Sequence, residues 1–481
     1  MNRLLVATTG ALLLTASGCT RTEEEKHDCE PEAFDLSTCD RSGFASVKAE
    51  GIWNLNITVD GVDSQGSIRF LPDKPLLLGT ELTVSKVEGD TFFVASDFQT
   101  ASTPAPVRFV LAGCQAPSPD RVQGEFRRCV NGEADLRGTF EAAHIEWGQG
   151  EQEASGVELV SETTLPRGQP VDVFVADGYA YVTALTSGLF VYNVKKDPAH
   201  PEKVAEISPK SDIWYRSWVK GTVLYISSYN EGLLVYDVSN PAAPKRLMAL
   251  PNPSVQGWGL AVEQDRLYLM SPAPDAEVLI YDISTPTKPA LQSRYFVQDS
   301  IVGMGQIPVE GVVLNNRLYI GHWRYGLAVA DVTDPKKPAP LGNFKYDNAT
   351  SRPVAVGQIG DRLIAFESSE GWGSMIRALD VTDPQHISQV GQFEMGPEST
   401  VGGLTLVGSK LYVAHNQDGL RILEMSNPST PRQLAYYNTW RETDSGRGQT
   451  FLEGLNGVRV PGDGFIYATE TSRGLLVFRE P

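Results

Sequence analysis

The chain has 481 residues, and its 59 Asp and Glu outnumber its 41 Lys and Arg to give a formal net charge of −18. Such an acidic chain does not offer the basic face that binding to a phosphate backbone requires, so we expect no nucleic-acid partner. The same acidity keeps an exposed protein in solution and attracts cationic partners only weakly.

The amino terminus has the composition of an export signal. Arg3 precedes a mostly apolar run, Leu4 to Leu14, which is too short to cross a bilayer as a stable anchor. The sequence Ala16-Ser17-Gly18-Cys19 that follows resembles the lipobox of bacterial lipoproteins, which implies cleavage before Cys19 and acylation of its sulfur. The alternative is a simple secreted protein in which this cysteine stands by chance.

This resemblance divides the amino terminus into a signal peptide, residues 1–18, and an acylated polar tether, residues 19–28. No later segment of the sequence approaches the roughly 18 apolar residues of a membrane span, so we expect the acyl chains to provide the membrane contact. The predicted location is the bacterial cell envelope, at the outer membrane or the cell surface.

Four further cysteines, Cys29, Cys39, Cys114 and Cys129, lie between the tether and residue 146. An even number confined to one segment of an exported chain predicts two disulfides. The spacing favours Cys29 with Cys39 and Cys114 with Cys129, because each pair closes a short loop, although three pairings are open. A zinc site is the weaker alternative, since the spacings lack the C-x-x-C form and no histidine is close to either pair.

Residues 29–146 predict a small β-sandwich or barrel that carries these disulfides. Six short alternating runs are separated by turn residues, at 53–59, 66–70, 81–84, 91–94, 107–111 and 136–140. About 120 residues are enough to bury one core. The following stretch, residues 147–155, is rich in Gly, Glu and Gln and is predicted to be a linker.

One unit recurs seven times in residues 156–481. It begins with an apolar and aromatic strand, at 180–182, 224–226, 267–269, 318–320, 363–365, 411–413 and 466–468. A second strand follows a polar turn, at 188–192, 232–236, 278–281, 326–329, 375–379, 419–423 and 474–478. The period of about 44 to 55 residues is that of four-stranded propeller blades, so we predict a seven-bladed β-propeller.

The sequence from Gly232 to Pro241, Gly-Leu-Leu-Val-Tyr-Asp-Val-Ser-Asn-Pro, resembles the LVIVD repeats of bacterial and archaeal surface proteins. The resemblance covers about residues 156 to 481 and implies a propeller in a surface setting. The family has no agreed chemistry, so the resemblance transfers no catalytic residue to this chain.

The last unit stops soon after its strand at 474–478 and therefore lacks an outermost strand. The segment 156–162 alternates as an edge strand does, and we expect it to complete the last blade and close the ring.

An aspartate follows the second strand in several units, at Asp237, Asp282, Asp331 and Asp380. Each precedes a Ser or Thr and a Pro in the same turn, so the carboxylate is expected to cap backbone N–H groups. A calcium ion in each blade is the weaker alternative, because it would need more oxygen ligands than this motif offers.

Ligands of propellers usually sit over the central channel, on one face of connecting loops. The residues assigned to that face follow the apolar triplet that begins a unit, lie near the start of an inner strand, or are aromatic residues of the loops. The candidate ligand-binding residues are Trp214, Tyr215, Arg216, Trp258, Glu310, His322, Trp323, Glu367, Trp372, His415 and Glu470. The simpler interpretation of each Trp is that it packs its own loop.

No catalytic motif is present in the sequence, so no catalytic residue and no cofactor are predicted. The leading hypothesis is a binding or scaffold lipoprotein that presents the loop face to a protein, peptide or glycan. The alternative is an extracytoplasmic hydrolase or lactonase with a divalent metal at the central rim, near His322, Glu367 and His415.

Overall fold

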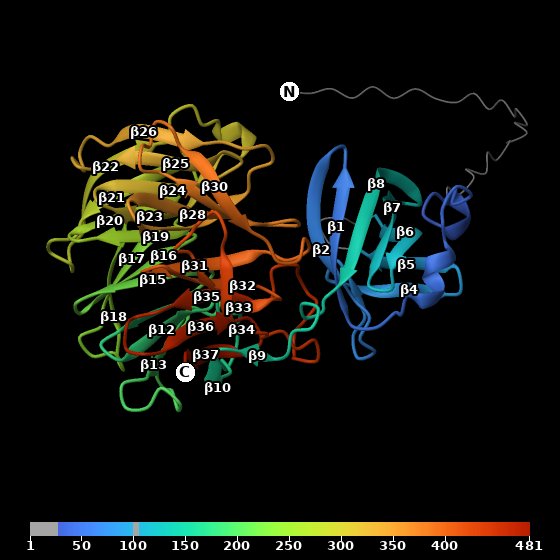
Figure 1. Cartoon of the computed structure of the whole chain (residues 1–481), viewed down its shortest axis with the longest axis horizontal. Helices are drawn as coiled ribbons and strands as arrows, with labels where there is room; N and C mark the ends of the chain where they lie inside the picture. Colours follow the sequence, from blue (N-terminus) through green and yellow to red (C-terminus); the bar gives the residue numbers. More distant parts are fainter. Residues whose placement is uncertain (1–26, 100–104) are drawn as a thin grey trace, which may run out of the picture.

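The structure is a computed structural model that describes residues 27–99 and 105–481. Two all-β bodies lie side by side, an amino-terminal barrel and a larger propeller (Figure 1). The predicted signal peptide, Cys19 and nearly all of the tether lie outside the described residues. None of the described helices is long and apolar enough to span a membrane.

The amino-terminal body is a closed barrel in which the first strand pairs with the last, from Trp53 opposite His144 to Thr58 opposite Thr139. Its strands are β1 (Ile52–Val59), β2 (Val62–Arg69), β3 (Leu76–Leu77), β4 (Thr80–Glu88), β5 (Thr91–Phe98), β6 (Val107–Ser118), β7 (Arg121–Val130) and β8 (Glu133–His144). The structure therefore decides between the two predicted forms in favour of the barrel. Strands β3 and β7 were not predicted, because β3 is only two residues long and β7 carries three arginines and a glycine.

Side chains that alternate inward along the strands fill the barrel, among them Trp53, Phe92 and Phe140. Two short 3-10 helices, η1 (Pro31–Ala33) and η2 (Ser42–Ser46), precede the first strand. Helix η2 adds Phe44 to the core, where its ring stacks on Phe92 at 6.2 Å between centroids. The segment before the barrel is thus part of its core.

The disulfides join Cys29 to Cys129 and Cys39 to Cys114, across 100 and 75 residues. The pairing favoured by short loops is therefore wrong, and the bonds leave no cysteine of the four for zinc. In the β6–β7 ladder Cys129 faces Arg108, six residues before Cys114, which separates the two cysteines by about 20 Å along the sheet. Each cysteine of the amino-terminal segment instead meets one on the barrel wall.

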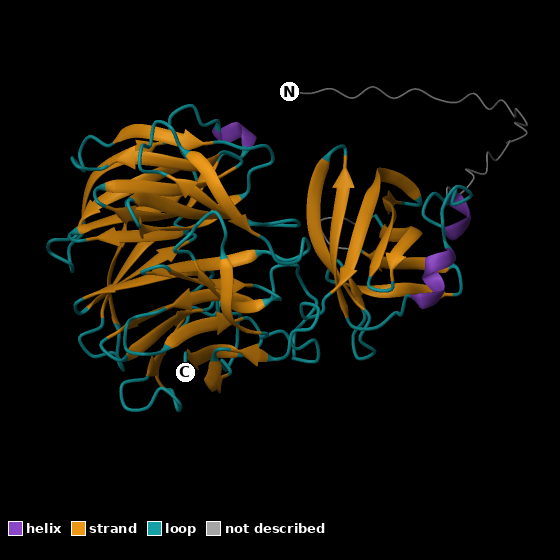
Figure 2. Cartoon of the chain, in the orientation of Figure 1, coloured by secondary structure: helices purple, strands orange, loops and turns teal. Residues whose placement is uncertain are grey.

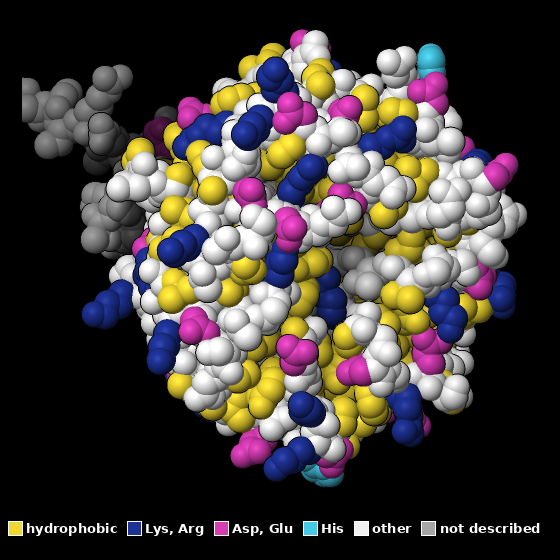
Figure 3. All heavy atoms as spheres, turned by 90° about the vertical axis from the view of Figure 1, so that its left-hand side faces the viewer, with side chains coloured by type: hydrophobic (Ala, Val, Ile, Leu, Met, Phe, Trp, Pro, Cys, Tyr) yellow, Lys and Arg dark blue, Asp and Glu magenta, His cyan; other side chains and the backbone are white. Residues whose placement is uncertain are grey.

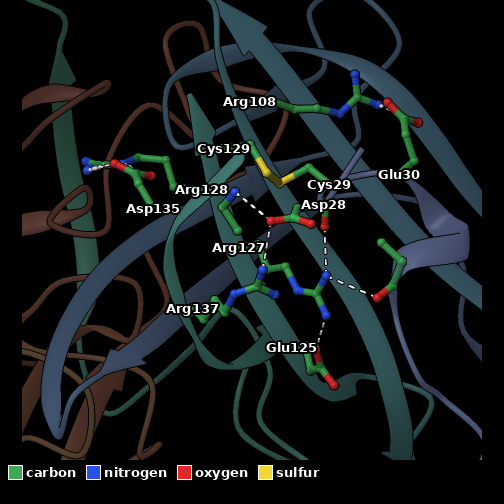
Figure 4. The surroundings of a disulfide bond; sticks show 12 residues. Asp28, Cys29, Glu30, Arg108, Glu125, Arg127, Arg128, Cys129, Asp135 and Arg137 are labelled. Carbon is green, nitrogen blue, oxygen red and sulfur yellow. Dashed lines mark hydrogen bonds and ion pairs between the residues drawn. A yellow bond between two sulfur atoms is a disulfide. The ribbon is translucent and has the colours of Figure 1, made fainter. Parts of the chain in front are cut away.

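Charged contacts hold the same segment beside the first disulfide (Figure 4). The Arg127 guanidinium donates to the carbonyl oxygen of Asp28 at 2.7 Å and lies 3.9 Å from the centre of the Phe34 ring. Arg137 forms an ion pair with the Asp28 carboxylate at 2.9 Å. Arg127 of β7 and Arg137 of β8 thus fasten the segment to the barrel.

The carboxy-terminal body is a propeller of seven four-stranded blades, as predicted. Blade one contains β11 (Asp172–Ala176), β12 (Tyr179–Thr183), β13 (Leu189–Asn193) and β14 (Glu202–Ile207), and blade two contains β15 (Trp214–Lys220), β16 (Val223–Ser228), β17 (Gly232–Asp237) and β18 (Lys245–Leu250). Blade three contains β19 (Gly259–Glu263), β20 (Arg266–Ser271), β21 (Glu277–Asp282) and β22 (Ala290–Phe296), and blade four contains β23 (Ile307–Leu314), β24 (Arg317–Trp323), β25 (Gly326–Asp331) and β26 (Ala339–Phe344). Blade five contains β27 (Ser351–Ile359), β28 (Arg362–Ser369), β29 (Ile376–Asp380) and β30 (Ser388–Phe393), and blade six contains β31 (Val401–Val407), β32 (Lys410–His415), β33 (Gly419–Glu424) and β34 (Arg432–Tyr437).

Blade seven closes the ring with strands from both ends of the domain. It contains β35 (Leu455–Arg459), β36 (Ile466–Glu470) and β37 (Gly474–Arg479), and its outermost strand is β10 (Glu158–Thr163). Strand β10 pairs antiparallel with β37, from Glu158 opposite Arg479 to Thr163 opposite Leu475. This confirms the closure predicted for segment 156–162.

The repeated residues of the propeller have structural roles. Strands β16 and β17 in the middle of blade two are almost wholly buried, and Tyr225 of the repeated triplet belongs to the core between blades. In the terminal turn, Asp331 accepts a hydrogen bond from the Thr333 N–H at 2.8 Å, and the same contact occurs at Asp237, Asp282 and Asp380. Hydrogen bonds from the hydroxyl and N–H of Thr333 lower the pKa of Asp331. The predicted capping role is confirmed.

Residues 147–155, predicted to be a linker, lie along blade six. Their last two residues form β9 (Ala154–Ser155), which pairs with β34 as a fifth strand. The carboxylate of Glu151 forms an ion pair at 2.9 Å with Arg421, a fully buried residue, and Tyr437 donates to Glu153 at 2.7 Å. These contacts connect the barrel to the propeller through an ordered segment.

The barrel also packs directly on one face of the propeller (Figure 1). Asn54 donates to the carbonyl oxygen of Glu398 at 2.9 Å, and Ser67 donates to that of Gly448 at 3.0 Å. Ile52 and Ile145 of the barrel form an apolar cluster with Trp440 of the propeller. Both carbonyls and Trp440 belong to connections from an outer strand to the next inner strand, so the covered face is the one predicted to bind ligands.

The face turned away from the barrel is open to view. Figure 3 shows it as roughly round, with charges of both signs scattered over it and a hollow near its centre. The two faces of the propeller therefore differ in what adjoins them.

Candidate binding site

A cavity of about 610 Å³ lies on the barrel side of the propeller, over the central channel. We call it the central cavity. Its walls include Tyr215, Arg216, Trp258 and Glu310, which come from the beginnings of inner strands or from the connections that precede them. A smaller space of about 240 Å³ shares Arg216 and Glu310 with it and is lined by residues of all seven inner strands. The site thus opens from the channel toward the barrel.

An alternating network of charges spans the central cavity. Glu310 of β23 accepts hydrogen bonds from Arg216 of β15 and from the Arg352 Nε at 3.2 Å. Arg352 also forms an ion pair with Glu370. Burial by itself disfavours the charge on Arg352, but its ion pairs with Glu370 and Glu310 raise the pKa of its guanidinium. The network thus joins two basic and two acidic side chains.

Aromatic side chains form a second part of the wall. The rings of Tyr215 and Trp258 are 5.7 Å apart at 42°, and Trp323 also lines the cavity. The Trp258 Nε1 is buried and has no hydrogen-bond partner in the described part of the chain. Burial raises the pKa of Tyr215. The wall thus offers aromatic and apolar area beside the charged network.

Glu453 also lines the central cavity, but its carboxylate is engaged by its own loop. It accepts hydrogen bonds from the N–H groups of Gly448, Gln449 and Thr450 at 2.7, 2.8 and 3.0 Å. Burial raises the pKa of Glu453. Its role is to shape the loop that packs against the barrel.

A second cavity, of about 640 Å³, lies between the β1–β2 hairpin of the barrel and the propeller. We call it the interdomain groove. Gln65 lines it from the barrel, and Trp323 and Trp372 line it from the propeller. Trp323, Glu370, Thr450 and Leu452 line the groove and the central cavity alike, so the two spaces adjoin.

Five candidate residues, Trp214, His322, Glu367, His415 and Glu470, are buried inside the blades and line neither cavity. Trp214 begins the inner strand β15. The other four lie in β24, β28, β32 and β36, because these strands continue past the apolar triplet that marks each of them in the sequence. The Trp214 indole, for example, donates to Asp212 at 2.8 Å.

The three residues proposed for a rim metal are each held by neighbours of their own. The His322 ring packs on Tyr325 at 5.1 Å, and burial lowers the pKa of His322 to about 4. The remaining two have polar partners: Glu367 accepts a hydrogen bond from Tyr346 at 2.7 Å, and His415 contacts Asp418 at 3.0 Å. Among residues 27–99 and 105–481, no group of three His, Cys, Asp or Glu has the arrangement of a metal site.

Glu470 is likewise held within its blade, by Arg447 at 2.6 Å. The structure thus brings together Tyr215, Arg216, Trp258, Glu310 and Trp323 in the central cavity and places Trp372 in the adjoining groove. Their role in ligand binding stays a prediction.

Sequence analysis did not select Glu370, Leu452 and Gln65 as site residues. Glu370 follows a strand end in blade five, a position that the repeat marks only weakly because this blade has the most divergent copy. Nothing in the sequence indicates Gln65 as a site residue, because it lines the groove only through the packing of the barrel on the propeller.

Fold and site define this chain as a seven-bladed β-propeller with a disulfide-bonded eight-stranded barrel over one face. It carries LVIVD repeats: the family model described as "LVIVD repeat" matches residues 216–248, 273–297 and 401–439. No curated protein matches the chain.

Two solved structures are among those that match the chain. One chain in the crystal structure of the mitotic checkpoint complex is 12% identical with a TM-score of 0.51, over 70% of this chain and 99% of that one. The computationally designed Ika8 protein is 10% identical with a TM-score of 0.47, over 67% of this chain and 99% of that one. At such low identity the likeness to the checkpoint chain concerns the fold alone.

Proposed function

We propose that this protein is a binding module that holds its ligand in the central cavity, between the propeller and the barrel. The observation that carries the proposal is the convergence of Arg216, Glu310 and Trp258 on one mostly apolar cavity of about 610 Å³. A concave apolar surface with a few convergent polar groups is the usual form of a ligand site. The residues come from three different blades, so the repeat alone does not account for them.

Leu452 offers a direct test, because it lines the central cavity and is 39% exposed, so a substitution there is compatible with folding. Leu452→Glu places a charge at the mouth of the cavity. A matched control is Leu247→Glu, at a residue that is 41% exposed on the outer strand of blade two.

The measurement is thermal unfolding of the purified protein with a library of amino-acid derivatives, short peptides and oligosaccharides. We expect compounds that raise the Tm of the wild type and of Leu247→Glu but not that of Leu452→Glu. Equal shifts in the two variants, or no shift with any compound, would contradict the proposal.

We also propose that the protein is a lipid-anchored component of the cell envelope, attached through Cys19. Support comes from the two disulfides, which form in oxidising compartments outside the cytoplasm. Detergent-free fractionation is expected to recover the wild type with membranes and Cys19→Ser in the soluble fraction. A Cys19→Ser variant that still sediments with membranes would count against the anchor.

A further inference from the structure

The connection from β22 to β23, residues 297–306, exposes an unusual amount of apolar surface. We call it the apolar loop. Ile301, Val302 and Met304 are 54%, 45% and 58% exposed, and Phe296 just before the loop is 52% exposed. The short helix η3 (Val302–Met304) in this loop is the purple helix at the upper edge of the propeller, on the side toward the barrel (Figure 2). Four large exposed apolar side chains within nine residues mark an interaction surface.

The apolar loop adjoins both cavities of the candidate site. Ile307, the residue that follows it, lines the central cavity. Arg324, which lines the interdomain groove, donates to the carbonyl oxygen of Met304 at 3.3 Å. The central cavity, the groove and the apolar loop therefore form one continuous surface. This surface extends well beyond the space that a small molecule in the central cavity would occupy.

The polar groups of the site favour a ligand without net charge. Arg216 and Arg352 are balanced by Glu310 and Glu370, so the network attracts neither an anion nor a cation strongly. A peptide group fits such a site, because it carries no net charge.

We propose that the ligand is an extended, uncharged apolar segment of another polypeptide, with a large apolar side chain in the central cavity and its chain running along the groove to the apolar loop. This inference rests on the proposed function and specifies its ligand. A soluble oligosaccharide is able to stack on the aromatic rings of Trp258 and Trp323. It does not bury the aliphatic surface of Ile301, Val302 and Met304, because it is largely polar.

The probes are acetyl-Ser-Leu-Phe-Leu-Ser-amide, its charged counterpart acetyl-Ser-Glu-Phe-Glu-Ser-amide, and the oligosaccharides maltopentaose and chitotetraose. Binding to the full chain is followed by tryptophan fluorescence, to which Trp258 and Trp323 contribute, and by calorimetry. We expect the apolar peptide to bind with a Kd below about 1 mM and the charged peptide at least tenfold more weakly. The oligosaccharides are expected not to bind.

Three variants locate the peptide. Leu452→Glu is expected to weaken binding at least tenfold, and the double substitution Ile301→Ser with Met304→Ser about threefold or more, because the first charges the cavity mouth and the second removes the apolar loop's surface. The control Leu247→Glu should bind as the wild type does. Circular dichroism and the Tm confirm that each variant is folded.

The outcomes separate this inference from the proposed function. Binding of an oligosaccharide that depends on Leu452, without binding of the peptide, overturns the peptide inference and leaves the central cavity as a ligand site. Peptide binding that depends on the apolar loop but not on Leu452 overturns both, since the ligand would then lie outside the cavity. Absence of binding by every probe overturns the peptide inference.

Discussion

The barrel and the propeller reach stability in different ways. The barrel has one main core and is cross-linked by two disulfides that span 100 and 75 residues. The propeller has no cysteine and instead repeats a similar apolar cluster between neighbouring blades, closed by one strand from its beginning. The comparison teaches that the two bodies are closed differently. A disulfide restricts the unfolded chain, whereas the pairing of β10 with β37 acts in the folded state, where it completes the ring.

Removal of residues 470–481 should destabilise the propeller more than any other change, because it deletes β37 from between β36 and β10. We expect the propeller to lose its cooperative thermal transition while the barrel stays resistant to protease. Differential scanning calorimetry and limited proteolysis measure both. Removal of Pro481 alone is the control, and an unchanged Tm after the longer truncation would refute closure by β10.

Substitution of Cys29→Ala together with Cys129→Ala should destabilise the barrel alone. The loop that this bond closes has about 100 residues, so we expect a loss of about 3 to 5 kcal/mol in its free energy of unfolding. Urea denaturation followed by fluorescence checks the loss, with the propeller transition as the internal control. A non-reduced digest in which Cys29 is linked to Cys39 would contradict the pairing.

Acidification should destabilise the propeller through His322. Its pKa is about 4 in the folded protein and near 6.5 in the unfolded chain, so the unfolded state takes up the proton first as the pH falls. The stabilisation present above pH 6.5 is lost between pH 6.5 and 4, by up to about 3 kcal/mol.

The measurement is the free energy of unfolding of wild type and His322→Phe between pH 7 and pH 4. The variant should show a smaller decline, because its ring cannot be protonated while carboxylate titration is common to both proteins. Parallel profiles of the two proteins would mean that His322 does not titrate as inferred.

Loss of one terminal-turn cap should have a small effect. Asp331→Ala removes the acceptor for the Thr333 N–H, and we expect a loss below about 1 kcal/mol because the turn is largely exposed. Asp331→Asn, which keeps an oxygen acceptor, should recover most of it in the same urea titration. A loss of several kcal/mol, or one reversed by added calcium, would favour the calcium alternative.

Chelation should have the smallest effect. His322, Glu367 and His415 each contact neighbours of their own, so we expect no change in Tm with EDTA and no stoichiometric metal by elemental analysis. Calcium or zinc bound one to one, and lost in Glu367→Gln, would favour the hydrolase or lactonase alternative.

The site was only partly accessible to sequence analysis. Arg216 and Glu310 were selected because they stand near the start of inner strands, and Tyr215 was selected as an aromatic residue of the loops. The structure places all three in the central cavity. His322 and Glu367 were selected because they follow the apolar triplet that begins a unit. In the structure they are still paired within the sheet, in β24 and β28, and they are buried. A repeat shows which positions are equivalent, but not where a strand ends or which way its last side chain points.

The number of blades, the closing strand and the capping turns could be determined from the sequence alone. Their signals are local: alternating apolar residues, turn residues at equal intervals, and an edge strand that the last unit lacks. The disulfide pairing, the barrel's docking and the groove containing Gln65 were decided only by the tertiary structure. The physical reason is that these features join residues far apart in the chain, and their distances depend on strand register and on how two separate bodies pack.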